Sequence, residues 1–278
     1  MTREVAHYWS TAALPGVDLL RARFVTHRFS RHAHEGYAIA LIESGVEEFD
    51  YGGSVERAGA GSFGLVNPGV VHTGHAGEPG GWSYRVLYPS VEVMRGIAAE
   101  LGAPPGTPYF PEAVVRDPEA ARLVRAAHRS GEHGDALATS SLFRAAVAGL
   151  LRHARPATGA VGPWGGDGAD RMPAAVRTVR DILHANLVDP PSLEELAETT
   201  GVSAFRLVRA FRAATGLPPH AYLNQIRVRE ARRLLDAGLR PAEVAARTGF
   251  ADQAHLTRHF KRAVGVPPGA YREARRAA

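Results

Sequence analysis

Two kinds of side chain in this sequence of 278 residues could do chemistry: histidines in its first third and arginines near its end. His32 and His34 lie two residues apart, and His72 follows the turn sequence Asn67-Pro68-Gly69. Three imidazoles that converge inside one fold are sufficient to bind zinc, iron or manganese, with a water at the open position. The alternative is that these histidines are hydrogen-bonded structural residues or shape a small-molecule pocket.

The composition removes several other chemistries. The chain has no cysteine, which excludes disulfide bonds, cysteine zinc sites, thiolate nucleophiles and self-alkylating thiols. It contains no G-x-S-x-G, Walker-type or dinucleotide motif. The N-terminus has no signal-peptide pattern, and no apolar stretch approaches the ~20 residues that span a bilayer. We therefore expect a cytoplasmic, nucleoid-associated protein without a membrane partner.

Charge is divided unevenly along the chain. Residues 171–278 carry 18 Lys and Arg against 10 Asp and Glu, a net charge of +8, whereas residues 1–170 have a net charge of −3. Between these parts, the run ARPATGAVGPWGGDGADRMP is rich in Gly, Pro and Ala and is typical of an inter-domain linker. We expect an N-terminal domain at 1–155, a linker at 156–172 and a basic domain that faces nucleic acid at 173–278.

The N-terminal part first favours strands and then helices. Residues 17–88 contain short β-prone runs such as LLRARFVTHRF, YAIALIESG, VEEFDY and WSYRVLY, with turn sequences at 51–54 and 67–69. This spacing predicts a small antiparallel barrel or sandwich. From about 90 to 153, Ala, Leu and Arg recur with helical spacing, which predicts helices packed on the barrel or on a partner subunit.

The C-terminal part contains an internal repeat with an offset of 49 residues. Both copies read L-x-R-x-F-[RK]-x-x-x-G-x-P-P-x-A-Y, the first from Leu207 to Tyr222 and the second from Leu256 to Tyr271. Chance does not supply nine such matches in register. The domain is therefore predicted to contain two copies of one supersecondary unit.

Each copy has the sequence pattern of a helix-turn-helix unit. In the first copy, Ser192 and Glu195 have the spacing of a capping box, and Ser203 can cap the next helix. In the second copy, Gly249 suits the turn because it tolerates positive φ, and Asp252 can cap the helix that follows.

The second helix of each unit separates apolar from basic residues. Leu207 and Phe211 in one helix, and Leu256 and Phe260 in the other, recur with helical spacing and are expected to be buried. Any single arginine on the opposite face could simply be a solvated residue, but the repeat favours contacts with base edges and phosphates. The candidate DNA-binding residues are Phe205, Arg206, Arg209, Arg212, Gln253, Ala254, His255, Arg258, Lys261 and Arg262.

These motifs resemble the DNA-binding domain of the AraC-type (arabinose-regulator) transcription factors, in which a long helix joins two helix-turn-helix units. The matching stretches, within 175–272, are SLEELAETTGVSAFRLVRAFRAATGLPPHAYL, RVREARRLL and PAEVAARTGFADQAHLTRHFKRAVGVPPGAYR. The resemblance implies that Phe205, Arg206 and Arg209 face bases from one recognition helix, and that Gln253, Ala254, His255 and Arg258 do so from the other. A joining helix at about 220–237 would hold the recognition helices about one DNA turn (~34 Å) apart.

A cupin-like barrel with the effector pocket commonly precedes this domain in the family, and residues 20–90 resemble it. The fold class implied is α+β, with an N-terminal cupin-like β-barrel carrying accessory helices and an all-α C-terminal domain with two helix-turn-helix units. The spacing of cupin metal ligands is matched by His32, His34 and His72, but Glu43 lies further along than the expected carboxylate. We expect no cofactor, with a divalent metal at the three histidines as the alternative.

Aromatic residues accompany the histidines and could line the pocket or belong to the core. The candidate effector-binding residues are His32, His34, Tyr37, His72, Trp82 and Tyr84, with Tyr88 close in sequence.

Two hypotheses about function follow. In the first, the chain is a non-enzymatic transcription regulator whose effector shifts the population of states that bind promoter DNA. Its partners would be double-stranded DNA, a small molecule, RNA polymerase if it is an activator, and a second copy bound through helices at 118–155. In the second, it is a metal-dependent cupin oxygenase or isomerase tethered to a DNA-binding domain. Metal content discriminates between them.

Overall fold

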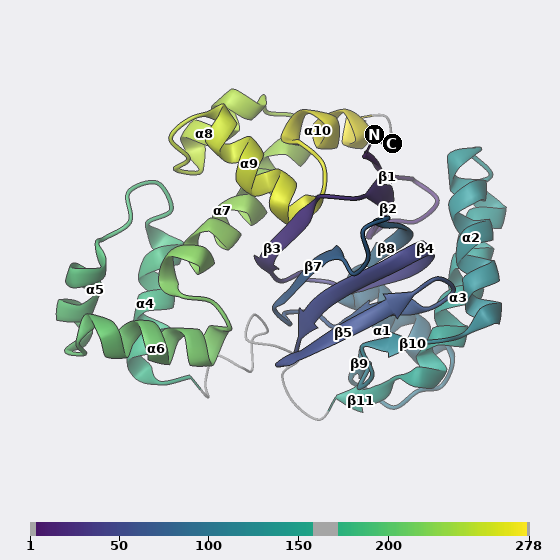
Figure 1. The fold of residues 1–278 in the computed structure, drawn as a ribbon, viewed down its shortest axis with the longest axis horizontal. Coiled ribbons are helices and arrows are strands. Elements are labelled where there is room, and N and C mark those ends of the chain that lie inside the picture. Colours follow the sequence, from purple (N-terminus) through teal and green to yellow (C-terminus); the bar gives the residue numbers. More distant parts are fainter. Residues whose placement is uncertain (1–3, 158–171, 277–278) are drawn as a thin grey trace. The chain divides into compact units, whose positions relative to one another are not determined.

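The computed structural model describes residues 4–157 and 172–276, which form an N-terminal and a C-terminal unit (Figure 1). Strand β11 (Arg155–Ala157) pairs with β9 (Thr107–Tyr109), so the first two residues of the expected linker belong to the N-terminal unit. The rest of that linker, apart from Met172, lies outside the described residues.

The N-terminal unit is built from antiparallel strands. The long ones are β1 (Val5–Ser10), β2 (Val17–Phe24), β3 (Arg28–His32), β4 (Ala38–Tyr51), β5 (Ser54–Gly59), β6 (Phe63–Val66), β7 (His72–Ala76) and β8 (Trp82–Pro89). One path of paired strands runs β1-β2-β8-β4-β6-β10, where β10 is Val114–Val115, and a second path runs β3-β7-β4-β5. Because β4 belongs to both paths, the two sheets enclose a barrel.

The sequence predicted this barrel with some differences in its strands. The runs YAIALIESG and VEEFDY form one strand, β4, and strand β1 was missed altogether. The expected turn at 51–54 joins β4 to β5 through Gly52 and Gly53, whose φ values are +59° and +96°. Two successive residues with positive φ match the right-handed twist of a tight hairpin, which explains the glycine pair.

Helices cover one wall of the barrel. They are α1 (Val91–Glu100), α2 (Pro118–Glu132) and α3 (Ala136–Leu150), followed by a short 3-10 turn at Leu151–His153. Helices α2 and α3 lie side by side (Figure 1), and their apolar faces share one core with the outward side chains Ile39, Leu41 and Leu87 of the barrel. The expected helices at 90–153 are therefore present, with β9 and β10 inserted between them.

The C-terminal unit is all helical within the described residues. Its helices are α4 (Ala174–Ala185), α5 (Leu193–Thr200), α6 (Ala204–Thr215), α7 (Pro219–Asp236), α8 (Pro241–Arg247), α9 (Gln253–Val264) and α10 (Pro268–Arg276). Helices α4 to α6 pack around the start of α7, and α8 to α10 pack around its other end (Figure 1). No described helix has the length and apolar character needed to cross a membrane.

The predicted repeat is a repeat of structure. Phe211 and Tyr222 meet edge to face with ring centroids 5.3 Å apart, and their counterparts Phe260 and Tyr271 meet at the same 5.3 Å. Edge-to-face contacts of this kind add to the stability of an apolar core. Gly216 and Gly265 end α6 and α9 in the left-handed conformation, at equivalent positions.

The helix caps follow the sequence at two of three positions, and the predicted turn glycine also has the expected conformation. Ser192 and Glu195 form the expected reciprocal capping box at the start of α5, and the Asp252 carboxylate accepts a hydrogen bond from the His255 amide at 2.6 Å. Gly249 takes a φ of +76° at the second turn. The expected cap at Ser203 is wrong in one respect, because its side chain makes no capping hydrogen bond.

Candidate functional site

The recognition helices α6 and α9 bury one face and expose the other. Leu207, Phe211, Leu256 and Phe260 are fully buried, as the apolar spacing predicted. The residues expected to bind DNA lie on the outer faces. Nine of these ten are exposed, namely Phe205, Arg206, Arg209, Arg212, Gln253, Ala254, Arg258, Lys261 and Arg262, whereas His255 is half-buried.

The half-burial of His255 has a local cause. Its ring lies 5.3 Å from the ring of Phe250 and 4.8 Å from that of His259, and its Nδ1 accepts a long hydrogen bond of 3.4 Å from the Ala251 amide. These contacts hold the imidazole against the turn of the second unit. Only part of the side chain remains available to a ligand.

Phe205 is unusual because it is an aromatic residue with 71% of its surface exposed. The guanidinium carbon of Arg209 lies 5.7 Å from the centre of its ring, one helical turn further along α6. A cation over an aromatic face is attracted by the ring quadrupole. Phe205 and Arg209 therefore lie together on the outer face of α6.

Helix α7 determines how the two helix-turn-helix units are arranged. Its 18 residues span about 27 Å at 1.5 Å per residue. Its Arg227 is buried, donates from Nε to the Leu187 carbonyl at 2.8 Å and lies 5.9 Å from the ring of Phe250. Arg227 therefore connects the loop before α5 to the turn before α9. Arg227 could not be singled out from the sequence, because it resembles any other arginine in a basic helix.

The barrel contains a cavity of about 40 Å³ between its two sheets. Four of the six expected effector residues line it, namely His32, His34, His72 and Tyr84, together with Tyr88 and the buried carboxylate of Glu47. The other two, Tyr37 and Trp82, do not line this cavity. Tyr37 lies in the core beneath the helices, where its hydroxyl donates to the Pro108 carbonyl, and Trp82 packs on Phe24.

A β-bulge in β4 decides which glutamate faces the cavity. Ile42 pairs with Tyr84 and Ser44 pairs with Ser83, so Glu43 is an extra residue in the ladder. One inserted residue reverses the faces of everything that follows. Accordingly Ala40 lines the cavity before the bulge and Glu47 lines it after the bulge.

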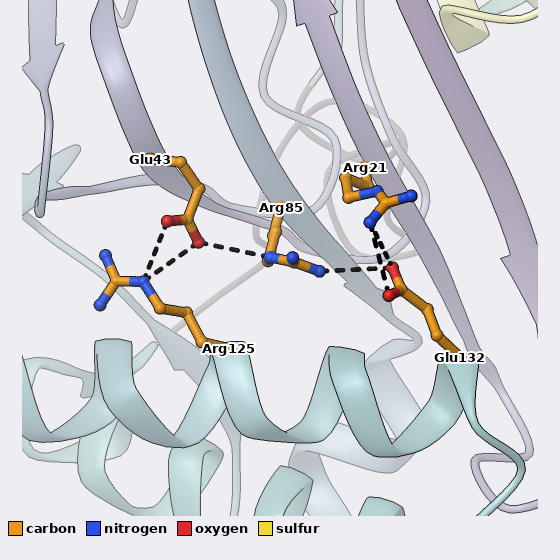
Figure 2. A network of polar contacts seen from close by, with 5 residues as sticks. All are labelled: Arg21, Glu43, Arg85, Arg125 and Glu132. Atoms are coloured by element: carbon orange, nitrogen blue, oxygen red, sulfur yellow. Dashed lines mark hydrogen bonds and ion pairs between the residues drawn. The ribbon is translucent and has the colours of Figure 1, made fainter.

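Glu43 itself points away from the cavity toward helix α2 (Figure 2). Its carboxylate lies 3.0 Å from Nε of Arg125 and 3.4 Å from Nε of Arg85. Arg85 also reaches Glu132 at 3.4 Å, and Arg21 reaches the same carboxylate at 3.3 Å. These ion pairs attach α2 to the sheet. Because the Glu43 carboxylate faces α2, it is not the carboxylate ligand of the metal site that the sequence suggested as an alternative.

Glu47 is the acidic residue that sequence reasoning missed. Burial raises the pKa of its carboxyl to about 8, because a charged carboxylate is poorly solvated there. Gly74 on the neighbouring strand leaves room for it, since a β-carbon at that position would lie 3.0 Å from Glu47 Oε1. The alternation of the strand did not identify this residue because the bulge has no clear sequence signature.

The three histidines come together as their spacing suggested. His32 and His72 are directly opposed across strands β3 and β7, and one ligand atom of each histidine, including His34, lies within 4.8 Å of the others. Burial lowers the pKa of His32 to about 4 and also lowers that of His72, although backbone hydrogen bonds act in the opposite direction. Both imidazoles are therefore neutral at pH 7.

The chain resembles known proteins in both units. A family model described as the AraC-like ligand binding domain matches residues 14–147, and one described as a helix-turn-helix domain matches residues 196–274. The uncharacterized HTH-type transcriptional regulator YbfI of Bacillus subtilis is 28% identical over 241 residues, which are 86% of each chain. The HTH-type transcriptional activator RhaR of Cronobacter sakazakii is 32% identical over 113 residues, which are 40% of this chain and 38% of RhaR.

A solved structure of ToxT from Vibrio cholerae, bound to an unsaturated fatty acid, has the same fold. It matches with a TM-score of 0.51 and 12% identity over 98% of this chain and 95% of its own. A ligand-binding barrel followed by two helix-turn-helix units defines a DNA-binding transcription regulator. The chain belongs to the AraC family of such regulators, which are not enzymes, so the enzyme hypothesis is set aside.

Proposed function

We propose that this regulator reads promoter DNA with α6 and α9 and responds to a small polar effector in the barrel cavity. The observation that carries the proposal is the repetition of one exposed basic face. Arg209 and Arg258 occupy equivalent positions, as do Arg212 and Lys261, and all four are exposed. Such a repeat suits two successive major grooves, and the estimated length of α7 is of the same order as one DNA turn.

The roles of the exposed residues follow from their chemistry. Arginine can bind guanine bidentately, and glutamine can bind adenine, so Arg209, Arg258 and Gln253 are the proposed base readers. Arg212 and Lys261 lie in the last turns of their helices and are proposed to bind phosphate, which sets affinity without sequence preference.

The proposed effector site is the cavity lined by His32, His34, Glu47, His72 and Tyr84. Imidazoles, a carboxyl and a phenol offer hydrogen-bond donors and acceptors inside an otherwise apolar wall. A cavity of about 40 Å³ admits only a few non-hydrogen atoms, so we infer a small polar molecule or the polar end of a larger one. Binding would shift the population of the DNA-competent state.

The remaining proposed partners are a second copy of the chain and RNA polymerase. Helices α2 and α3 are proposed to bind a second copy of the chain. RNA polymerase is the expected partner if the protein activates transcription, and the cytoplasm is the expected compartment. Within the chain, we propose a sensor domain that extends to residue 157 and a DNA-binding domain from residue 172.

The proposal is tested by selecting genomic DNA fragments on the purified full chain and sequencing them. The expected result is a motif with two half-elements about 10 base pairs apart. The double variant Arg209→Ala/Arg258→Ala should lose that motif, because it removes the two arginine base readers, one from each helix.

A matched control removes the same charge elsewhere. Arg28 and Arg116 are exposed in the N-terminal unit and lie outside α2 and α3, so Arg28→Ala/Arg116→Ala should retain the motif. Fragments without sequence preference, bound equally well by all three proteins, would show that binding is electrostatic only and would refute the proposed base readers.

A further inference from the structure

We propose that the N-terminal unit has a second small-molecule site, outside the barrel, for an apolar molecule that carries one negative charge. The site is a cavity of about 290 Å³ between helix α1, the end of α3 and the two-stranded sheet of β9 and β11. We call it the β11 cavity. It shares no lining residue with the barrel cavity, so the proposal goes beyond the proposed function and does not depend on what the barrel binds.

The walls of the β11 cavity are mostly apolar. Ala98 of α1 lies on one side, and Pro108 of β9 and Pro156 of β11 lie on the other. Leu101, at the end of α1, also lines the cavity although 56% of its surface is exposed. The volume is at the lower end of the ~300–1,000 Å³ that is usual for small-molecule sites. Because apolar surface gains stability when it leaves water, these walls favour an apolar ligand.

Two arginines give the cavity its charge. Arg152 and Arg155 line it and are both exposed, so they mark its open side. Arg152 lies 3.2 Å from the Asp117 carboxylate, whereas Arg155 forms no ion pair with any described residue. His153, which is 3.2 Å from the same carboxylate, adds charge only when it is protonated. Two guanidinium groups and one carboxylate leave a net charge of +1, which favours a monoanion.

The donors of these arginines match a carboxylate. A guanidinium group has five N–H donors in a planar fork, and Arg152 directs one terminal nitrogen at Asp117. Its other donors and those of Arg155 are available for charge-assisted hydrogen bonds. The ligand would therefore place its apolar body between α1 and the sheet, with its carboxylate at the two arginines.

Contacts between the walls hold the cavity in shape. Nε of Arg95 on α1 donates to the Thr107 hydroxyl on β9 at 2.9 Å, and Arg144 on α3 pairs with Glu100 on α1 at 2.6 Å. Strand β9 lies beside α1 and pairs with β11 (Figure 1). A site that is formed before its ligand arrives loses less free energy on binding. A ligand that contacts both strands would also stabilise their pairing, since a two-stranded sheet is only weakly stable alone.

The test is isothermal titration calorimetry of the full chain with 4-phenylbenzoate, an apolar monoanion, and with 4-phenylbenzamide, a neutral molecule of the same shape. The proposal predicts one equivalent of 4-phenylbenzoate per chain with a Kd below about 1 mM. The amide should bind roughly tenfold more weakly, because it lacks the charge-assisted hydrogen bonds. Hydrogen exchange in residues 104–109 and 151–157 should slow when the benzoate is bound.

Two variants change the β11 cavity itself. Arg155→Gln should bind the benzoate roughly tenfold more weakly and the amide as wild type does, because only the charge is removed. Ala148→Phe should abolish binding of both compounds, since a half-buried lining residue of α3 is replaced by a ring that fills the space. Circular dichroism and the melting temperature show that each variant is folded.

Two control variants should bind as wild type. Arg116→Gln removes an exposed positive charge that lines neither cavity, and His34→Gln changes only the barrel cavity. No binding by the wild type at millimolar 4-phenylbenzoate, or equal affinity for the benzoate and the amide, would overturn the proposal. Loss of binding in His34→Gln but not in Arg155→Gln would place the ligand in the barrel and would also overturn it.

Discussion

Substitution of Phe205 tests the DNA-binding surface directly, because its side chain contributes little to the stability of the protein in the absence of DNA. It is 71% exposed, and the guanidinium carbon of Arg209 lies 5.7 Å from the centre of its ring. An exposed cation–π contact contributes about 0.5–1 kcal/mol. Phe205→Ala should therefore change the free energy of unfolding by less than about 1 kcal/mol, as surface substitutions usually do.

The same substitution should have a larger effect on the complex with DNA. An aromatic side chain can bury about 150–250 Å², of which 71% is still exposed here, leaving roughly 110–180 Å². At about 25 cal/mol per Å², full burial against thymine methyl groups and sugars would contribute at most about 3–4.5 kcal/mol. Incomplete burial reduces the expected loss to about 1–3 kcal/mol, a roughly 5- to 150-fold weaker affinity.

The assay is fluorescence anisotropy with the duplex recovered by selection and with a scrambled duplex, at one fixed salt concentration. Val55→Ala is the matched control, since Val55 is 61% exposed but belongs to β5 of the N-terminal unit. Phe205→Ala should bind the selected duplex more weakly, and Val55→Ala should bind it as wild type. Unchanged affinity, or a loss of several kcal/mol in unfolding free energy, would refute the reasoning.

Two further predictions concern stability. Gly249→Ala should cost more than about 2 kcal/mol in urea unfolding followed by circular dichroism, because φ is +76° and the new β-carbon would lie 2.5 Å from the Leu187 carbonyl oxygen. Gly238→Ala, with φ of +88° and open space around it, should cost only about 1 kcal/mol, so equal losses would contradict the steric argument. Burial raises the pKa of Glu4, but hydrogen bonds from the amides of residues 25–27 and from the Thr26 hydroxyl dominate and lower it to about 2. Because the folded pKa lies below the ordinary 4.5, the stabilisation by Glu4 is complete above about pH 4.5 and lost as the pH falls toward 2. Glu4→Gln should therefore be less stable at pH 7 by about 1–2 kcal/mol, with a difference that disappears in acid. A constant difference across that range of pH would rule this out.

Local patterns predicted much of the fold and of the DNA-binding surface. Helical spacing identified the buried pairs Leu207/Phe211 and Leu256/Phe260. The exposed face of each helix could then be predicted, because it lies opposite the buried face. The capping box at Ser192 and the turn at Gly249 could also be predicted, because each depends on neighbouring residues and on backbone conformation alone. A duplicated motif made these assignments mutually consistent.

The contents of the cavity depended on contacts between distant strands. The bulge at Glu43 turned Glu47 inward, and it arises from the pairing of β4 with β8. Tyr37 directly precedes β4 and Trp82 begins β8, but their positions along the barrel place Tyr37 in the core beneath the helices and Trp82 beside Phe24. Spacing in one strand does not contain this information.

The sequence by itself determined that this protein has two helix-turn-helix units with basic outer faces, because helix formation and capping are local. It also brought His32 and His34 close together, and a turn motif marked His72. Only the tertiary structure decided that Glu47 joins them and that Arg227 connects the two halves of the DNA-binding domain. Strand register and the burial of a charged side chain depend on partners far along the chain, and for that reason they become visible only when the chain has folded.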